Sequence, residues 1–113
     1  MQRLRSDIWV AALLRRAQTE GAFATLRRRG AEQAGAIFIV VNCLDGRNQL
    51  YGPAPQMAFD DDTADRLFIQ VLSDATSAEI DERLESEFRF DPDCWVVDVD
   101  DRQERPFAEI LKE

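Results

Sequence analysis

The chain has 113 residues, of which 45% are hydrophobic and 32% are charged, and this balance is typical of an ordinary globular protein. We expect residues 1–113 to form a single domain, because this length can bury one continuous core. The net charge is −8. Histidine is absent, and this absence excludes serine–histidine and cysteine–histidine hydrolases. Residues 1–30 carry seven arginines and two acidic residues, whereas residues 58–113 carry eighteen acidic and six basic residues.

The longest apolar run, residues 34–41, is far shorter than the roughly 20 residues that a membrane-spanning helix needs. Near the N-terminus, Arg15 and Arg16 interrupt the apolar stretch where a signal peptide would continue towards its cleavage site. The only two cysteines, Cys43 and Cys94, each lie beside an apolar run, which is typical of buried free thiols. These features predict a cytoplasmic protein without membrane contact, and no cofactor is expected.

The first predicted element is a helix that begins at Ser6 or Asp7 and ends near Glu20, with Gly21 as its stop. A strand over residues 8–12 competes with this assignment, because strand-favouring residues stand at its start. In the helix, apolar residues recur every three or four positions and would face the core: Trp9, Val10, Leu13, Leu14 and Ala17.

Two strands are predicted next, at residues 22–26 and 36–43, and the polar segment between them can close a hairpin. The second strand is apolar on both faces, which predicts the central strand of the sheet. Asp45 and Gly46 supply the positive φ angles of a tight turn, and residues 49–51 can return as a strand paired with the central one. Prolines then take the chain out of the sheet from residue 52 onwards.

Residues 67–72 alternate as a strand, although the same apolar positions also suit a helix. Thr76 and Glu79 form a capping box, which predicts a helix that starts there, and Pro92 marks its end. Residues 94–99 read as a clear strand, with every second side chain pointing inward.

Pro106 can open a final short helix through Leu111. Together the elements predict an α+β fold, in which a mostly antiparallel sheet of about five strands is covered by two or three helices. We expect residues 49–51 and the last strand at the two edges of this sheet. Asp98 and Asp100 would repel across a paired edge, so we expect a monomer or a weak dimer that joins through helix faces.

Four stretches stand out by their order and spacing: Ile8-Trp9-Val10 leading to Leu14-Arg15-Arg16, Arg27-Arg28-Arg29-Gly30 followed by Ala34-Gly35-Ala36-Ile37-Phe38, Leu50-Tyr51-Gly52-Pro53-Ala54-Pro55-Gln56, and Arg89-Phe90-Asp91-Pro92-Asp93 with Trp95-Val96-Val97. In these stretches the chain resembles the alphaproteobacterial family known as domain of unknown function 1491. The resemblance covers nearly the whole chain and implies a free-standing domain. It implies no activity, ligand or catalytic residue.

The first candidate binding site is the loop that contains Tyr51, Pro53, Pro55 and Gln56, because a proline-stiffened loop with a tyrosine and an amide is a good rigid recognition surface. A rigid connection that protects a sheet edge is an equally good interpretation of the same loop. No complete catalytic constellation can be assembled from the sequence. The leading hypothesis is therefore a non-catalytic binding or adaptor domain that recognises a protein partner through this loop and an exposed sheet edge.

A second candidate site consists of Arg15, Arg16, Arg27, Arg28 and Arg29, which would form a positive patch if the first helix packs beside the hairpin. Such a patch could hold a phosphate ligand or a nucleic-acid backbone. The net charge of −8 and a basic set of thirteen arginines to one lysine favour the alternative, a solvated face.

A third hypothesis is a metal-dependent enzyme. Asp98 and Asp100 point to the same side of a strand, as paired carboxylates do in many phosphoryl-transfer sites, and the acidic loop 60–62 could add oxygen ligands. That loop lacks the spacing of a calcium-binding loop, and Cys43 with Cys94 supplies only two of the four ligands that zinc needs. No metal ligand set is assigned.

Overall fold

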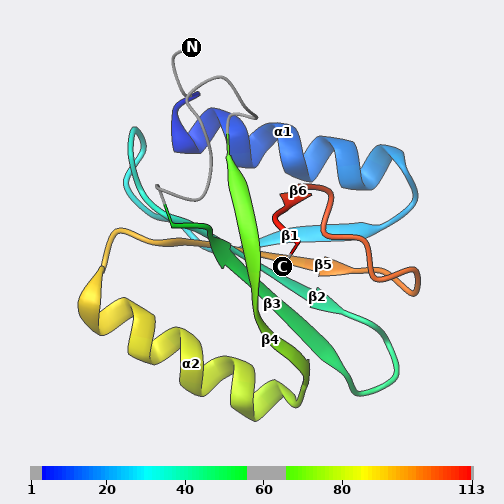
Figure 1. The fold of residues 1–113 in the computed structure, drawn as a ribbon. Helices are drawn as coiled ribbons and strands as arrows, with labels where there is room; N and C mark the ends of the chain where they lie inside the picture. The colour runs from blue at the N-terminus through cyan, green and yellow to red at the C-terminus, as the bar shows by residue number, and fades with distance from the viewer. Residues whose placement is uncertain (1–3, 56–65, 113) are drawn as a thin grey trace.

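The computed structural model describes residues 4–55 and 66–112. Within these residues, two helices enclose one six-stranded sheet, with α1 on one face and α2 on the other (Figure 1). The elements in chain order are α1 (Ser6–Thr19), β1 (Phe23–Arg28), β2 (Ile37–Asn42), β3 (Asn48–Pro53), β4 (Leu67–Ala75), α2 (Ser77–Phe90), β5 (Trp95–Asp100) and β6 (Glu109–Ile110).

The strands lie in the order β1-β5-β2-β3-β4-β6. The pairs β2–β5 and β4–β6 are parallel, and the other neighbours are antiparallel. The predicted α+β class with a mostly antiparallel sheet is thus confirmed, and the described residues contain six strands rather than about five. Neither of the two helices in this part of the chain is long and apolar enough to cross a membrane.

The predicted hairpin between β1 and β2 is wrong, because β5 lies between these strands. Val96 and Val97 of β5 point to opposite faces and both are fully buried, so this strand requires cover on both faces. The glycines of the supposed hairpin have a different role. A Cβ atom at Gly30 or Gly35 would collide with the carbonyl of Asp93, so these positions let the chain pass close to the start of β5.

The predicted sheet edges are also wrong, since β3 and β5 each have a neighbouring strand on both sides. The described edges are β1 at one end of the sheet and β6 with most of β4 at the other. β3 continues through Gly52 to Pro53 rather than leaving the sheet there, and it pairs with β4 up to its last residue. Asp98 and Asp100 therefore lie on an interior strand, where the predicted repulsion across a paired edge does not arise.

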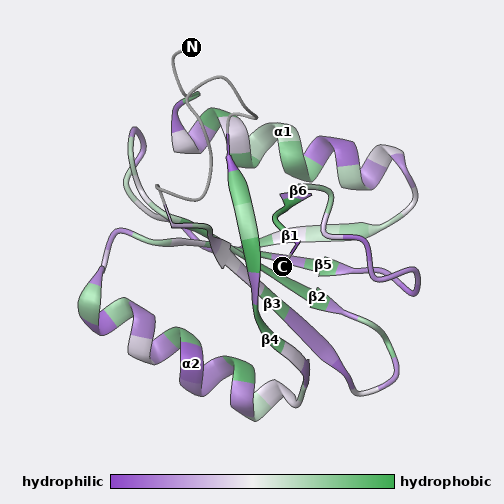
Figure 2. Cartoon of the chain, in the orientation of Figure 1, coloured by the Kyte–Doolittle hydropathy of each residue, from purple (hydrophilic) through white to green (hydrophobic). Residues whose placement is uncertain are grey.

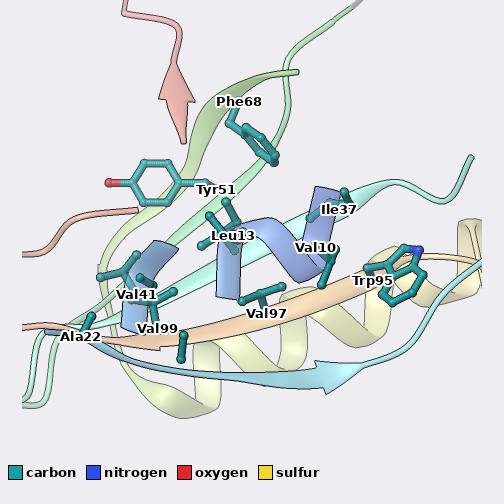
Figure 3. Close-up of a cluster of buried hydrophobic side chains, with 13 residues drawn as sticks. Val10, Leu13, Ala22, Ile37, Val41, Tyr51, Phe68, Trp95, Val97 and Val99 are labelled. Carbon is teal, nitrogen blue, oxygen red and sulfur yellow. The ribbon is translucent and has the colours of Figure 1, made fainter. Parts of the chain in front are cut away.

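Helix α1 forms as predicted, and the competing strand over residues 8–12 is wrong. Val10, Leu13 and Ala17 are buried against the sheet. Figure 3 shows Val10 and Leu13 in this position. The expected N-terminal cap is absent, because the residue before the helix is Arg5 and its side chain makes no capping bond. Ser6 is fully buried and its hydroxyl donates instead to the carbonyl of Gly35, at 2.7 Å.

The central position of β2 is confirmed, and its two faces belong to two hydrophobic cores. Ile37, Ile39 and Val41 face α1, whereas Phe38 and Val40 face α2. Because both faces are covered, an uninterrupted apolar run is what this strand requires.

The second half of the chain contains two confirmed elements and one correction. Residues 67–72 belong to a strand, and the capping box of Thr76 and Glu79 opens α2 as predicted. The final helix after Pro106 is wrong. Phe107 has a φ of 58°, which a right-handed helix does not allow, and the chain goes on to form β6 instead.

The turn between β2 and β3 also differs in detail from the prediction. Gly46 has a positive φ of 93°, as expected, but the second such residue is Leu44, with φ 66°, rather than Asp45. The Asp45 carboxylate instead accepts a hydrogen bond from the backbone N–H of Arg47, at 3.1 Å.

Candidate functional site

Most of β4 lies at an edge of the sheet. Its inner side pairs with β3, whereas on its outer side β6 pairs only with Leu67 and Phe68. No other strand in the described part of the chain pairs with residues 69–75 on that side, and Figure 1 shows β6 beside only one end of β4. An open strand edge presents unpaired N–H and C=O groups, which are a template for another extended chain.

A groove of about 570 Å³ lies along this open edge, and we call it the β4 groove. One wall is β4 itself and the other is the C-terminal segment, residues 106–112. The lining combines apolar side chains with a few polar groups, as ligand-binding grooves commonly do. The lining residues are Tyr51, Ile69, Gln70, Val71, Leu72, Ser73, Pro106, Ile110, Leu111 and Lys112.

Tyr51 is the only member of the predicted binding loop among these lining residues. Its side chain belongs to the core under α1, and Figure 3 shows the hydroxyl oxygen pointing away from the packed side chains. The hydroxyl has no hydrogen-bond partner among residues 4–55 and 66–112. Burial, with the nearby Cys43 and Glu104, raises the pKa of Tyr51, so the hydroxyl keeps its proton at neutral pH and can donate to a ligand.

The rest of the predicted loop is placed elsewhere. Pro53 lines a separate cavity of about 160 Å³, together with Ala54 and Arg66. Pro55 is exposed at the end of the described segment, and Gln56 lies outside the described residues. Tyr51 and Pro53 therefore line different hollows, although both belong to β3.

A hydrogen-bonded network centred on the buried Gln49 supports the polar part of the β4 groove. The Gln70 side-chain amide donates to Gln49 Oε1 at 2.6 Å, and Gln49 Nε2 donates in turn to Asp74 Oδ1 at 2.8 Å. Gln49 is buried, and its Nε2 also lies 3.7 Å from Cys43 Sγ. These contacts fix the orientation of Gln70, one of the polar side chains that line the groove.

Arg47 connects this network to the C-terminal segment. Its guanidinium forms ion pairs with Asp45 at 2.8 Å, Asp74 at 3.1 Å and Glu104 at 2.9 Å. Hydrogen bonds from Arg47 hold the pKa of Asp45 below its usual range, and those from Gln49 and Arg47 do the same for the pKa of Asp74. One side chain thereby joins the β2–β3 turn, the end of β4 and the segment that leads to the groove wall.

Residues with an unusual backbone conformation cluster around Arg47 and the C-terminal segment. Non-glycine residues with positive φ are uncommon, and they often occur where a site demands an unusual backbone geometry. Within the described residues they are Leu44, Asp74, Glu104 and Phe107. Leu44 follows Cys43, Asp74 and Glu104 bind Arg47, and Phe107 follows Pro106 in the groove wall.

The five arginines of the predicted positive patch do not converge. Arg15 and Arg16 belong to α1, and Arg16 donates a hydrogen bond to the Phe107 carbonyl. Arg27 lies on the other face of the sheet, where it pairs with Asp98 and with Asp81 of α2, each at 3.0 Å.

The remaining two arginines also make internal contacts. Arg28 donates to the carbonyls of Pro92 and Cys94, and its guanidinium lies 4.1 Å from the centre of the Phe88 ring. Arg29 is 3.7 Å from a Glu32 carboxylate oxygen. Four of the five guanidinium groups therefore have partners within the protein, whereas Arg15 is exposed on α1.

The paired carboxylates of β5 do lie on one face, beside a cavity of about 180 Å³. Asp98 is ion-paired with Arg27 there, which offsets its charge. No group of three or more cysteine, aspartate or glutamate side chains in the described residues could hold a metal ion. Asp60, Asp61 and Asp62, proposed above as further ligands, lie outside the described residues.

Both cysteines are free, buried and unsuited to nucleophilic chemistry. Burial raises the pKa of the Cys43 thiol, and it raises the pKa of Cys94 to about 12. Both thiols are therefore protonated at neutral pH, whereas a catalytic cysteine reacts as the thiolate.

Comparison with known proteins connects this geometry to a family. A family described as "Protein of unknown function (DUF1491)" matches residues 4–109. The chain belongs to the DUF1491 family. No curated protein matches it.

Solved structures of similar proteins share this fold along almost the whole chain. A solution structure of a protein from A. tumefaciens is 40% identical, with a TM-score of 0.85, and the match covers 99% of this chain and 98% of that one. A crystal structure of a DUF1491 family protein from Caulobacter crescentus CB15 is 35% identical, with a TM-score of 0.80, and the match covers 98% and 100%. An NMR structure of a DUF1491 family protein from the same organism is 35% identical, with a TM-score of 0.81 and coverage of 99% and 100%.

Sequence reasoning missed most of the β4 groove of this DUF1491 protein. The alternation of residues 67–72 predicted a strand, but nothing local in the sequence indicates that this strand lies at an edge. The groove wall formed by Pro106, Ile110 and Leu111 was hidden in a predicted helix. Only Tyr51 was selected in advance.

Proposed function

We propose that this DUF1491 protein is a non-catalytic protein-binding domain, which adds an extended segment of a partner protein to the open edge of β4. The observation that carries the proposal is the coincidence of an open edge over residues 69–75 with the β4 groove. In such strand addition, main-chain hydrogen bonds supply affinity, and pockets for alternate side chains supply specificity.

The groove contains groups suited to each part of this recognition. Pro106, Ile110 and Leu111 offer apolar contact to side chains of the bound segment. The Tyr51 hydroxyl and the Gln70 amide can form hydrogen bonds with it. Burial raises the pKa of the nearby Cys43 thiol, so this side chain supplies no thiolate nucleophile beside these groups at neutral pH.

The test is a titration of the ¹⁵N-labelled protein with an acetylated peptide of about eight residues, in which valine alternates with glutamine. We expect saturable NMR shift changes centred on residues 69–73 and 110–112. Two further peptides carry N-methyl groups on one or the other alternate set of backbone amides. Only one set faces β4 in a paired strand, so one peptide should lose binding and the other should retain it.

A pair of variants tests the role of the groove. Tyr51→Phe removes only the hydroxyl, and we expect it to weaken peptide binding by about threefold to tenfold, the effect of one hydrogen bond. Thr25→Val, on the opposite edge strand β1, should leave binding unchanged. Shift changes centred on β1, or equal effects of the two N-methylated peptides, would overturn the proposal.

A further inference from the structure

The two sides of the open β4 edge differ in chemistry. A strand added to this edge would alternate its side chains between the two faces of the sheet. One set would enter the β4 groove on the side of the C-terminal segment. The other set would point towards α2, where a second hollow of about 430 Å³ lies between Leu72 and the helix. We call this second hollow the α2 hollow.

The β4 groove suits apolar side chains. Its outer wall presents Pro106, Ile110 and Leu111, and the ring of Tyr51 contributes from the sheet. The one charged residue that lines it is Lys112, near the end of the described segment. Aliphatic or aromatic side chains would be removed from water there, which favours their binding.

The α2 hollow is acidic by contrast. Glu79, Glu82 and Glu85 line it against Arg83 and Arg89. Figure 2 colours much of α2 as hydrophilic, and the helix sequence has five acidic residues and two arginines.

One of these arginines is already neutralised, since Arg83 pairs with Glu87 at 2.9 Å. Glu82 and Glu85 are exposed and make no ion pair with any other residue that the structure describes. The hollow therefore presents unbalanced negative charge, in the half of the chain that carries eighteen acidic and six basic residues. A positive side chain is the complement of such a surface.

Resting on the proposed function, we infer that the segment bound at β4 alternates apolar residues with lysine or arginine. The apolar residues occupy the β4 groove and the basic residues face Glu82 and Glu85. A second copy of this chain does not fit this pattern. Its own β4, residues 67–75, contains no basic residue, and pairing two β4 edges would bring two acidic α2 helices together.

Three acetylated peptides of about eight residues test this inference. Valine alternates with lysine in the first, with glutamine in the second and with glutamate in the third. We expect affinity to fall in that order, with the lysine peptide binding about tenfold or more tightly than the glutamate peptide at low ionic strength. The difference in affinity between the lysine and glutamate peptides should become smaller at high salt, because salt screens exposed charges.

A double variant, Glu82→Gln with Glu85→Gln, should reduce the affinity of the lysine peptide to that of the glutamine peptide. Its affinity for the glutamine peptide should stay the same, which shows that the fold is intact. Glu32→Gln is the matched control, because this exposed carboxylate pairs with Arg5 and Arg29 away from α2.

The outcomes separate the two proposals. Equal affinity for the three peptides, or tighter binding of the glutamate peptide, would overturn the inference about charge and leave strand addition standing. Failure of all three peptides to bind at low salt would overturn both. Self-association through β4, detected as concentration-dependent broadening of residues 69–75 without peptide, would replace the basic partner with a second copy.

Discussion

At the scale of single residues, Trp95 shows why two glycines stand in the segment between β1 and β2. The indole is buried, and its Nε1–H donates to the Ala31 carbonyl at 2.7 Å. A Cβ atom at Gly35 would collide with the Asp93 carbonyl and lie 2.9 Å from Trp95 Cδ1. The Asp93 carbonyl belongs to the backbone and the Trp95 ring is fully packed, so neither group can move easily to make room for a Cβ atom.

We therefore expect Gly35→Ala to lower the free energy of unfolding by about 1–3 kcal/mol, the range typical of overpacking. Urea denaturation followed by Trp fluorescence measures the change. Gln33→Ala is the control, because this side chain lies in the same segment and is exposed. Equal stability of the Gly35 variant and the native protein would contradict the packing argument.

Asp101 provides a residue whose contribution depends on pH. It is buried, and its carboxylate accepts hydrogen bonds from the Arg105 guanidinium, the closest at 2.8 Å, and from the Arg105 backbone N–H at 3.0 Å. The Arg105 guanidinium is the main reason that the pKa of Asp101 is lowered. A carboxylate with a lower pKa in the folded state stabilises the fold above its unfolded pKa of about 4 and loses this effect as pH falls through the folded value.

Asp101→Asn should therefore be less stable than the native protein at pH 7, and the difference should shrink as the pH falls below about 4. Urea denaturation at a series of pH values measures both curves. Glu85→Gln serves as the reference, since Glu85 makes no ion pair with the other described residues. A stability difference for Asp101→Asn that stays constant down to low pH would show that the carboxylate charge has no such role.

At the scale of elements, α2 is specified almost entirely by local sequence. The Thr76 hydroxyl accepts the Glu79 N–H at 3.1 Å, and the Glu79 carboxylate accepts the Thr76 N–H at 2.9 Å. Ile80 and Leu84 are one turn apart and both are buried against the sheet. The start, the apolar face and the end of this helix follow from residues between Thr76 and Pro92.

Thr76→Ala should reduce the free energy of unfolding by about 1 kcal/mol, the usual effect of losing an N-cap hydroxyl. Chemical denaturation monitored by circular dichroism measures it. Ser86→Ala, inside the same helix, should change stability by less than about 0.5 kcal/mol, because alanine is the better helix former. If the two variants were equally stable, the capping box would be contributing nothing.

Strands are less well specified by their own residues. β5 was correctly predicted as a strand in which Trp95, Val97 and Val99 share one face. Val96 on the other face is buried as well, and the predicted position of the strand in the sheet was wrong. Its parallel partner β2 is separated from it by β3, β4 and α2. Alternation defines which side chains share a face, but it does not define which strand lies alongside.

At the scale of the whole molecule, charge is the property that bears on assembly. The net charge of −8 and the acidic α2 beside the open β4 edge oppose contact between two copies at that edge. The expectation of a monomer or a weak dimer stays a prediction, now for this reason rather than for the repulsion at β5. Light scattering at micromolar concentration should give a monomer mass at low salt.

Added salt should increase any self-association, because screening weakens the repulsion between like charges. Light scattering of the same sample at rising sodium chloride concentration measures this. A stable dimer at low salt that dissociates as salt is added would mean that attraction between opposite charges joins the copies, contrary to this expectation.

The amino-acid sequence by itself determined the α+β class, both helices and the central strand β2. Each depends on a short-range pattern: a capping box, a helical repeat or an apolar run. The tertiary structure alone decided the strand order, the edges and the β4 groove, because these depend on pairing between distant segments. The tertiary structure also determined the position of the C-terminal wall of the groove. Arg47 binds Glu104 there and Arg16 binds the Phe107 carbonyl, and both Glu104 and Phe107 have a positive φ. Those long-range contacts override the local helix signal of Pro106, and they place residues 106–112 beside the edge of β4.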